Sequence, residues 1–319
     1  MTASILIPAY NASIFLTATL ESCVIQGEEN VHEIIVIDDQ SEDDTLALAQ
    51  HFAKAHPQFD FVIETSRKKG ACAARNRAYA LATGEAIQWL DADDILGPNK
   101  LRTQLELLKI NPNHLVASKW RRFEGDLTNM HPEEGGNWTD VPGMSTPLEW
   151  LKSERMMIPG GWLGTRELFD KTGPWDESLS INQDGEYFTR AIAASQGVVF
   201  EPESQVYYRT GVPGSVSQFN PEKAPSLFRS CLSFEEVAMS LGNSHEVGTL
   251  ISNKYQAFLY RVYPHVPDLR KAAREKIRTF GKPTLLNDVA ESTVAKLVCL
   301  LLGWKTLVQL RLIKSKISG

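Results

Sequence analysis

The sequence predicts an α/β protein with a doubly wound, mainly parallel sheet and a helical C-terminal extension. Through about residue 110, short continuous apolar runs alternate with helical patterns, which is typical of parallel strands covered by helices on both faces. From Pro221 onward the strand signals disappear and apolar residues recur at helical spacing. A chain of 319 residues is long enough for about two domains. We therefore expect one domain over residues 1–218 and a helical region over residues 219–319.

The first expected strand, residues 4–8, is an apolar run that a proline ends. A loop containing Tyr10 and Asn11 follows. Asparagine often caps helix N-termini, so we expect Asn11 to cap the next helix. Apolar residues recur at helical spacing in that helix: Leu16, Leu20 and Val24.

The second expected strand, residues 33–37, ends in a carboxylate pair that includes Asp39. Ser41 then precedes acidic residues that suit the first turn of a helix, where they complement the helix dipole. We interpret Asp43 and Asp44 as structural residues of that turn. We interpret Asp39 as a ligand-binding residue.

The third expected strand is residues 59–63. It precedes a basic, small-residue segment, residues 67–77, which runs into an Ala-rich helix that ends before Gly84. Positive charge leading into a helix N-terminus suits an anion. For Lys68 or Arg77 taken singly, a solvated surface position is the favoured interpretation.

The fourth expected strand, residues 86–90, delivers three carboxylates, Asp91, Asp93 and Asp94. Ligands bind at the carboxyl ends of strands in open α/β sheets. Alternate residues of an extended segment share a face, so Asp91 and Asp93 can converge on one cation. Oxygen ligands of this kind suit Mg²⁺ or Mn²⁺. The structural alternative is a solvated acidic turn.

Composition excludes several function classes. The formal net charge of -6 argues against a general nucleic-acid binder. The four cysteines are scattered without metal-ligand spacing, which suits a reducing compartment. Neither a dinucleotide-binding fingerprint nor a P-loop is present. We find no signal peptide and no apolar run of the roughly 20 residues that a membrane-spanning helix needs, so we expect a cytoplasmic protein.

Four segments together resemble family 2 glycosyltransferases of the GT-A fold: residues 5–11, residues 35–45, Gly70 with residues 74–76, and residues 89–94. The resemblance spans roughly the first 215 residues. It implies a nucleotide-sugar donor, a Mg²⁺ or Mn²⁺ ion on the donor diphosphate, and inversion at the anomeric carbon.

The resemblance also implies roles for individual residues. It places Asp93 at the metal and Asp91 at the ribose and donor. Further residues that it implies around the donor are Pro8, Tyr10, Asn11, Asp39, Gly70, Arg75 and Ala92.

Two later segments resemble donor-contacting parts of the family. Trp162, within residues 159–163, is expected to stack on a sugar, with a core position as the equal alternative. Arg209, within residues 207–217, is expected to contact the diphosphate, with a structural salt bridge as the alternative. Relatives often have a metal-binding His in the second segment, and this chain has none there. The metal is therefore expected to rely on Asp93, phosphates and water.

Residues 182–190 resemble the family's Glu-Asp motif, with Gln183 in place of the usual Glu and Asp184 retained. Apolar spacing places Asp184 in the first turn of a helix. From pattern alone, a simple helix-start carboxylate is an equal alternative. The resemblance favours Asp184 as the catalytic base that removes a proton from the acceptor hydroxyl.

The sequence also predicts the structure or the role of three other segments. Residues 124–140 read as a long functional loop, and Thr146 with Pro147 opens a short helix. Residues 292–319 are basic and amphipathic and contain no acidic residue, so they suit a peripheral contact with the inner face of a membrane or a second subunit of a homo-oligomer. A helix docked on its own domain is the alternative.

These observations predict a metal-dependent, inverting glycosyltransferase that uses a nucleotide sugar, with UDP-sugar as the expected donor. The expected acceptor is a saccharide or a lipid-linked saccharide in cell-surface polysaccharide, lipopolysaccharide or glycoconjugate synthesis. A nucleotidyltransferase and a non-catalytic sugar-nucleotide-binding module remain alternatives. The first should show a Gly-rich basic loop near the first strand, where this chain has residues 8–11.

Overall fold

The computed structural model describes residues 1–131, 138, 140–211, 219–284 and 303–310. The chain forms two compact units. Unit 1 consists of Met1–Ser178 and Gln183–Ser215, and unit 2 consists of Leu179–Asn182 and Val216–Gly319. Among the described helices, none combines the length and apolar character that crossing a bilayer requires.

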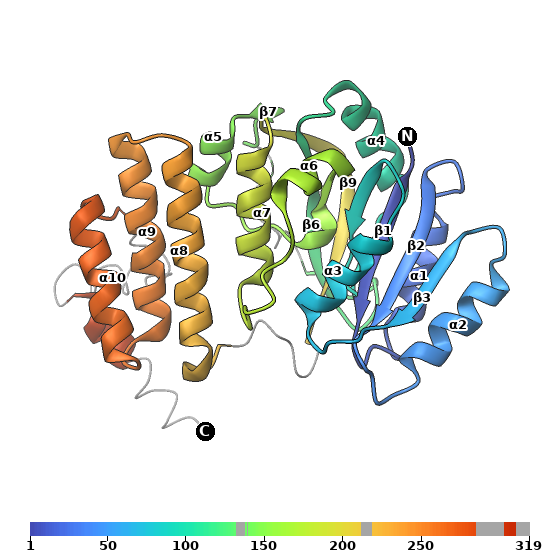
Figure 1. The fold of residues 1–319 in the computed structure, drawn as a ribbon, viewed down its shortest axis with the longest axis horizontal. Helices are drawn as coiled ribbons and strands as arrows, with labels where there is room; N and C mark the ends of the chain where they lie inside the picture. The colour runs from blue at the N-terminus through green and yellow to red at the C-terminus, as the bar shows by residue number, and fades with distance from the viewer. Residues whose placement is uncertain (132–137, 139, 212–218, 285–302, 311–319) are drawn as a thin grey trace. The chain divides into compact units, whose positions relative to one another are not determined.

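Unit 1 alternates strands and helices along the chain, as the sequence predicts (Figure 1). Its first half contains β1 (Ala3–Ala9), α1 (Leu16–Val24), β2 (Val31–Asp38), α2 (Thr45–Ala55), β3 (Phe61–Thr65), α3 (Ala71–Leu81), β4 (Ala86–Trp89), β5 (Ile95–Leu96) and α4 (Lys100–Ile110). Its second half contains β6 (Leu115–Glu124), β7 (Met144–Ser145), α5 (Pro147–Lys152), the 3₁₀ helix η1 (Pro159–Gly161), β8 (Trp162–Thr165), α6 (Arg166–Thr172), α7 (Gln183–Ala194) and β9 (Val198–Thr210).

The strands of unit 1 form one mixed sheet in the order β3-β2-β1-β4-β8-β6-β9-β5, with β7 also paired to β9. The first four strands run parallel, β8 is antiparallel to both its neighbours, and β6 and β9 are parallel. Helices lie on both faces of this sheet (Figure 1). The predicted doubly wound, mainly parallel α/β architecture is therefore confirmed.

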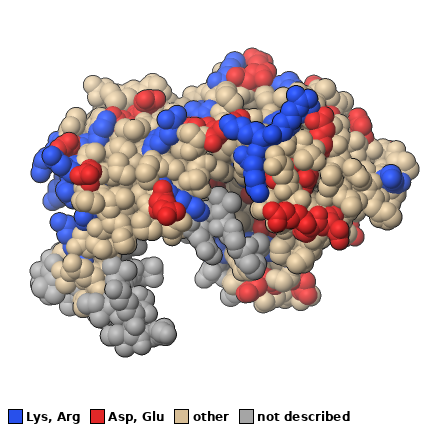
Figure 2. Space-filling view, turned by 60° about the horizontal axis from the view of Figure 1, so that its bottom comes forward, with Lys and Arg blue, Asp and Glu red and all other residues tan. Residues whose placement is uncertain are grey.

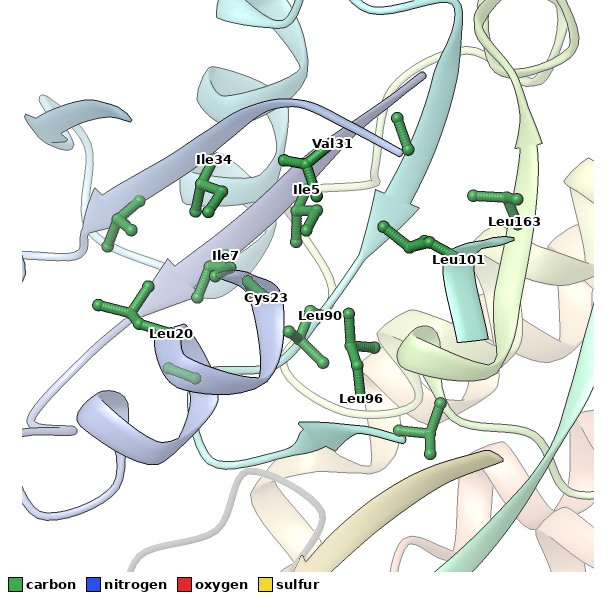
Figure 3. Close-up of a cluster of buried hydrophobic side chains, with 14 of the residues drawn as sticks. Ile5, Ile7, Leu20, Cys23, Val31, Ile34, Leu90, Leu96, Leu101 and Leu163 are labelled. Carbon is green, nitrogen blue, oxygen red and sulfur yellow. The ribbon is translucent and has the colours of Figure 1, made fainter. Parts of the chain in front are cut away.

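The core explains why the strands read as continuous apolar runs. Ile5 and Ile7 of β1 are fully buried, and so are Leu20 and Cys23 of α1, which pack in the same cluster (Figure 3). Leu6, on the other face of β1, is also fully buried. A strand covered on both faces has no solvent-facing position for polar residues, so alternation disappears.

Three strand ends meet at one edge of the sheet. In the register of β1 with β2, Ala9 pairs with Asp38, and in the register of β1 with β4, Leu6 pairs with Trp89. The next residues along each strand direction are therefore brought together at the carboxyl edge, where ligands of α/β sheets bind. These residues include Tyr10, Asp39 and Asp91.

Strand β9 contains an irregularity in its pairing with β6. Ser118 pairs with Glu201, but its neighbour Lys119 pairs with Gln205. Residues 202–204 therefore bulge from the ladder. The Glu201 carboxylate closes the bulge by accepting hydrogen bonds from two backbone N–H groups within it, those of Glu203 and Ser204.

Local predictions differ from the structure in two places. Asn11 does not cap the following helix, because α1 begins at Leu16. Its amide oxygen instead accepts a 2.8 Å hydrogen bond from the Glu42 N–H, which joins two loops at the edge of the sheet. Helix α2 begins at Thr45, after the acidic residues rather than with them. Asp43 bonds the Thr45 N–H at 3.1 Å, so it acts as a structural residue of the helix start, as predicted.

Unit 2 is helical, as predicted from Pro221 onward. It contains the 3₁₀ helix η2 (Pro221–Lys223), α8 (Ala224–Ser240), α9 (His245–Val262) and α10 (Pro267–Phe280), and the three α-helices lie side by side (Figure 1). Three expectations fall largely outside the described residues: the centre of the 124–140 loop, the loop beyond Gly211, and most of residues 292–319.

Candidate active site

Asp39 and Gly70 form the first part of the candidate site. The Gly70 N–H lies 2.8 and 2.9 Å from the two carboxylate oxygens of Asp39, which is 6% exposed. Gly70 has a φ of 130°, a backbone angle that favours glycine. Burial raises the pKa of Asp39 above its ordinary value, although the Gly70 N–H and Lys69 oppose the rise. The loop before α3 therefore fixes this carboxylate in one orientation.

Tyr10 offers an aromatic surface beside Asp39's strand end. The side chain is 46% exposed, and the Lys69 ammonium lies 4.7 Å from the ring centroid and 3.4 Å from the hydroxyl oxygen. Pro8, two residues earlier in β1, is partly buried. Lys69 lies in a run of basic residues, and nothing in the sequence distinguishes it from its neighbours as a site residue.

Arg75 joins two parts of the site that are far apart in sequence. From α3 it donates a 2.7 Å hydrogen bond to Asp91 and a 3.2 Å hydrogen bond to the side-chain oxygen of Gln183, the first residue of α7. The guanidinium lies 4.5 Å from the Trp175 ring centroid. Burial lowers the pKa of Arg75, but Asp91 together with Cys72 and Asp184 more than compensates, and the pKa lies above its ordinary value. Arg75 is therefore positively charged, and it lies between the segment after β4 and the start of α7.

Trp175 is itself held from two sides. Its ring stacks on Tyr187 of α7 with centroids 4.0 Å apart. Asn76 of α3 bonds both main-chain groups of Trp175, accepting from its N–H at 2.8 Å and donating to its carbonyl at 3.0 Å. Helix α3 thus fixes the segment before α7 through two consecutive residues, Arg75 and Asn76.

Asp184 lies in the first turn of α7, as predicted, and is partly buried. Burial raises its pKa, and the nearby Asp91 raises it further, while the Gly185 N–H and Arg75 lower it; the net shift is upward. A carboxylate with a raised pKa is a stronger base than one in water. Its position beside the Arg75 network is suitable for proton transfer.

Asp91 and Asp93 follow β4 and form a negatively charged pair. Burial and the neighbouring Asp91 raise the pKa of Asp93 to about 6. Among the described residues no Lys or Arg forms an ion pair with the Asp93 carboxylate. A divalent cation would relieve the repulsion between these carboxylates, so the donor set fits a Mg²⁺ or Mn²⁺ ion. The described residues contain no group of three or more His, Cys, Asp or Glu that could hold a metal alone, so phosphate and water oxygens would complete its shell.

Asp94 and Arg209 hold the backbone next to this pair in place through hydrogen bonds. Asp94 is fully buried; one carboxylate oxygen accepts a 3.0 Å hydrogen bond from the Arg209 N–H, and the other has no partner among the described residues. The Arg209 side chain donates 2.9 Å to the main-chain carbonyl of Asp93 and also donates to the Gly125 carbonyl. Its guanidinium lies 4.8 and 4.4 Å from the ring centroids of Phe15 and Phe123.

The environment of Arg209 bears on its predicted contact with a diphosphate. Arg209 is 7% exposed, and its side chain donates hydrogen bonds to the main-chain carbonyls of Asp93 and Gly125. The Arg209 side chain is thus bonded to carbonyls, and its contact with a diphosphate stays a prediction. Carbonyl positions are not visible in the sequence, which is why these bonds were not foreseen.

Trp162 and Ala92 also lie inside the protein. Trp162 is 1% exposed and packs on Phe188 and Trp150, each with a centroid distance of 5.5 Å, so it occupies the core position that was the alternative to sugar stacking. Ala92 is 7% exposed, and its carbonyl accepts a 2.9 Å hydrogen bond from the Thr19 hydroxyl.

The two basic residues that the sequence left open form ion pairs. Lys68 pairs with Glu177, and Arg77 pairs with Glu64 at 2.6 Å. The Arg77 and Glu64 side chains are 39% and 38% exposed, so this pair contributes little to stability.

Comparison with known proteins identifies a family for this chain. The model of glycosyl transferase family 2 matches residues 4–173. An uncharacterized glycosyltransferase from Haemophilus influenzae is 34% identical over 115 residues, which cover 36% of this chain and 44% of that protein, so this chain spans less than half of its length. The Escherichia coli UDP-Glc:alpha-D-GlcNAc-diphosphoundecaprenol beta-1,3-glucosyltransferase WfgD is 35% identical over 108 residues, which cover 34% of this chain and 41% of WfgD.

Solved structures show the same fold. The crystal structure of S. aureus TarS 1-349 in complex with UDP-GlcNAc is similar with a TM-score of 0.63 at 17% identity. The similarity covers 88% of this chain and 89% of the TarS chain. The GT-A type α/β fold that the sequence predicts is thereby confirmed.

Proposed function

Because the chain belongs to glycosyl transferase family 2, we propose that it transfers a sugar from a UDP-sugar to an acceptor hydroxyl, with inversion at the anomeric carbon. We assign donor binding and catalysis to residues 1–218 and keep residues 219–319 as a separate helical region. The UDP-GlcNAc complex of TarS supports a nucleotide sugar as the donor class.

The observation that carries this proposal is the position of Arg75. Its guanidinium bonds Asp91 at the end of β4 and Gln183 at the start of α7. Arg75 thus bonds the proposed donor-binding carboxylate directly, and it bonds the residue that precedes the proposed base, Asp184. A reaction that joins a donor and an acceptor needs both groups in one place.

We assign the nucleoside to the edge formed by β1 and β2. The exposed ring of Tyr10 offers a stacking surface for a base, and Pro8 and Asn11 flank it. The Asp39 carboxylate, oriented by the Gly70 N–H, can accept a hydrogen bond from a base N–H. Asp91 is assigned to the ribose and donor, as is Arg75 through its bond to Asp91.

A Mg²⁺ or Mn²⁺ ion bound to Asp93, with Asp91 beside it, would stabilise the negative charge of the departing diphosphate. The protein's own contribution is to hold these carboxylates at the strand end. The buried Arg209 fixes the Asp93 main chain through its carbonyl, and Ala92 is fixed through Thr19.

We assign the base role to Asp184. The acceptor hydroxyl oxygen attacks the anomeric carbon, the bond from that carbon to the diphosphate oxygen breaks, and the hydroxyl proton passes to an Asp184 carboxylate oxygen. Burial raises the pKa of this carboxyl, which strengthens it as a proton acceptor. Gln183, in the preceding position, is held by Arg75.

We propose a saccharide or lipid-linked saccharide as acceptor, in cell-surface polysaccharide, lipopolysaccharide or glycoconjugate synthesis. The name of the related WfgD, which gives a GlcNAc-diphosphoundecaprenol acceptor, supports this class. We further propose a cytoplasmic enzyme with a peripheral contact to the inner face of the membrane through residues 292–319, or a homo-oligomer through the same segment.

A thermal-shift panel of nucleotide sugars with and without Mn²⁺ tests the proposal. We expect UDP-sugars to raise the melting temperature, and Mn²⁺ to increase the shift. Incubation with the stabilising sugar donor and a lipid-diphosphate saccharide should then release UDP. Stabilisation by nucleoside triphosphates alone would favour the nucleotidyltransferase, and stabilisation without UDP release would favour a binding module.

A further inference from the structure

The chain carries an uneven distribution of charge. Its last 53 residues contain eleven Lys or Arg and four Asp or Glu, whereas the whole chain has a formal charge of -6. Such an asymmetry points to a contact with an anionic surface. The basic region begins at α10, which belongs to the described residues.

Three basic residues of α10 lie along its outward face. Lys271, Arg274 and Arg278 follow helical spacing, and Lys282 lies two residues past the helix end at Phe280. Lys271, Arg278 and Lys282 are exposed, and none of the four forms an ion pair with a described residue. Figure 2 shows basic side chains at the left edge of the molecule, where α10 lies. We name these four residues the α10 row.

The other side of α10 faces the protein. Ala273 is fully buried, and the helix packs on α9. Lys276 turns inward and forms a 2.6 Å ion pair with Glu235 of α8. The two acidic residues of the helix, Asp268 and Glu275, lie along one edge of the α10 row, so the row keeps an excess of positive charge.

We propose that the α10 row is a docking surface for an anionic lipid bilayer. From Lys271 to Arg278 the row follows α10 for about 10 Å, at 1.5 Å per residue. A flat sheet of phosphate groups can contact all its members at once. Each Lys or Arg near such a surface adds favourable energy.

The sequence that follows favours a bilayer over a water-soluble polyanion. Residues 292–319 contain fifteen apolar residues, five Lys or Arg and no Asp or Glu. This composition suits the boundary between headgroups and acyl chains, where apolar side chains are buried and basic ones meet phosphates. A soluble polymer offers no such apolar layer. The inference deepens the proposed function, because an enzyme held at the bilayer meets a lipid-linked acceptor.

Vesicle co-sedimentation of the full chain tests the proposal. We expect binding to phosphatidylcholine vesicles that contain phosphatidylglycerol, and weak binding to vesicles of phosphatidylcholine alone. The Lys271→Gln/Arg274→Gln/Arg278→Gln variant should lower the partition coefficient about a hundredfold, from the usual effect of three surface charges. Raising the salt concentration should weaken wild-type binding. The charge-preserving Lys271→Arg/Arg278→Lys variant should bind as wild type does.

A matched control separates the effect of the α10 row from the effect of a change in the net charge of the protein. Lys54 of α2 with Arg102 and Lys109 of α4 are exposed residues of unit 1, and the Lys54→Gln/Arg102→Gln/Lys109→Gln variant removes the same charge. It should keep vesicle binding within about twofold, since the proposal assigns bilayer contact to the α10 row and not to these residues. Equal losses in both variants, or no loss in the α10 variant, would overturn the proposal.

Two further measurements make the result unambiguous. Melting temperatures of both variants should match wild type, because the replaced side chains are on the surface. Binding of soluble polyphosphate, without vesicle binding, would replace the bilayer by an anionic polymer and overturn the proposal. Vesicle binding is measured without donor or acceptor, so its failure is distinguishable from failure of the proposed transfer reaction.

Discussion

Arg75 and Asp91 form an ion pair of 2.7 Å whose side chains are 9% and 27% exposed, at the point where β4 ends. Because the same guanidinium also bonds Gln183, this pair links a strand end to the start of α7. Lysine has a single ammonium group and cannot reproduce the planar fork that serves two acceptors.

Arg75→Lys should therefore lower kcat/KM by roughly ten- to a hundredfold, since a charge-assisted hydrogen bond contributes about 1.5–3 kcal/mol. Arg77→Lys is the matched control, because Arg77 lies two residues on in the same helix and pairs with Glu64 at the surface. Steady-state kinetics should show near-normal activity for the control. Equal activity of both variants would mean that the Arg75 link has no catalytic importance.

The Asp93 carboxylate should control the effect of metal on nucleotide binding. In wild type, UDP should bind more tightly with Mg²⁺ or Mn²⁺ than without. Asp93→Ala should remove this enhancement and also impair turnover, because its oxygen would no longer hold the ion beside the diphosphate. Calorimetry with and without metal measures the difference, and Asp60→Ala, at an exposed position, is the control. Equal metal dependence in wild type and Asp93→Ala would reject Asp93 as the ligand.

Asp184→Asn should separate binding from chemistry. A base acts in the transition state and adds little to donor affinity, so turnover should fall roughly 10²- to 10⁴-fold while the donor dissociation constant changes little. Kinetics and donor titration on the same preparations measure both. If the variant kept near-normal turnover, Glu186 would be the next residue to examine, although its carboxylate is paired with Arg190 at 2.7 Å.

Glu33 should make stability depend on pH. It is 4% exposed and accepts hydrogen bonds from the Ser4 hydroxyl and the Thr83 N–H, each at 2.6 Å. Burial alone raises the pKa of Glu33, but these bonds, with the Thr83 hydroxyl and the Gly84 N–H, lower it below the ordinary value. The folded pKa therefore lies below the unfolded pKa of about 4.3. The stabilisation is present above that pH and is lost as the pH falls through the folded pKa.

Glu33→Gln should lower the free energy of unfolding by about 1–3 kcal/mol at pH 7, because an amide cannot accept all these bonds. The difference from wild type should shrink as the pH is lowered below about 4. Urea unfolding at several pH values measures this, with the exposed Glu106→Gln as the control. A difference that stays constant from pH 7 to pH 3 would contradict the assignment.

The first four strands of unit 1 were predictable because burial in the sheet leaves a local trace in the sequence, whereas β5 to β9 were not predicted. Residues 33–37 were expected as a strand, and β2 covers Val31–Asp38. The helix start at Asp184 was predictable from apolar spacing. These features depend on neighbours in sequence, which a pattern can report.

The contacts that assemble the site leave no local trace. Arg75 and Gln183 are 108 residues apart, and nothing near either residue indicates the other. The bond from Arg209 to the Asp93 carbonyl depends on backbone positions that no residue type reveals. Trp162 could stack on a sugar or pack in the core with the same sequence around it, and only tertiary packing decides between them.

The register shift divides β9 into a stretch that ends at Glu201 and a stretch that begins at Gln205. The length of the bulge between them can change over evolution without changing the pairing of either stretch. The first stretch pairs with β7, and the last residues of β9 bring the Arg209 N–H to Asp94. A residue gained or lost among positions 202–204 changes only the bulge. The same change inside β1 would turn every following side chain to the opposite face of the sheet. Descendants of this chain can therefore remodel the β7 end of the sheet while the carboxylates at the other end stay in register.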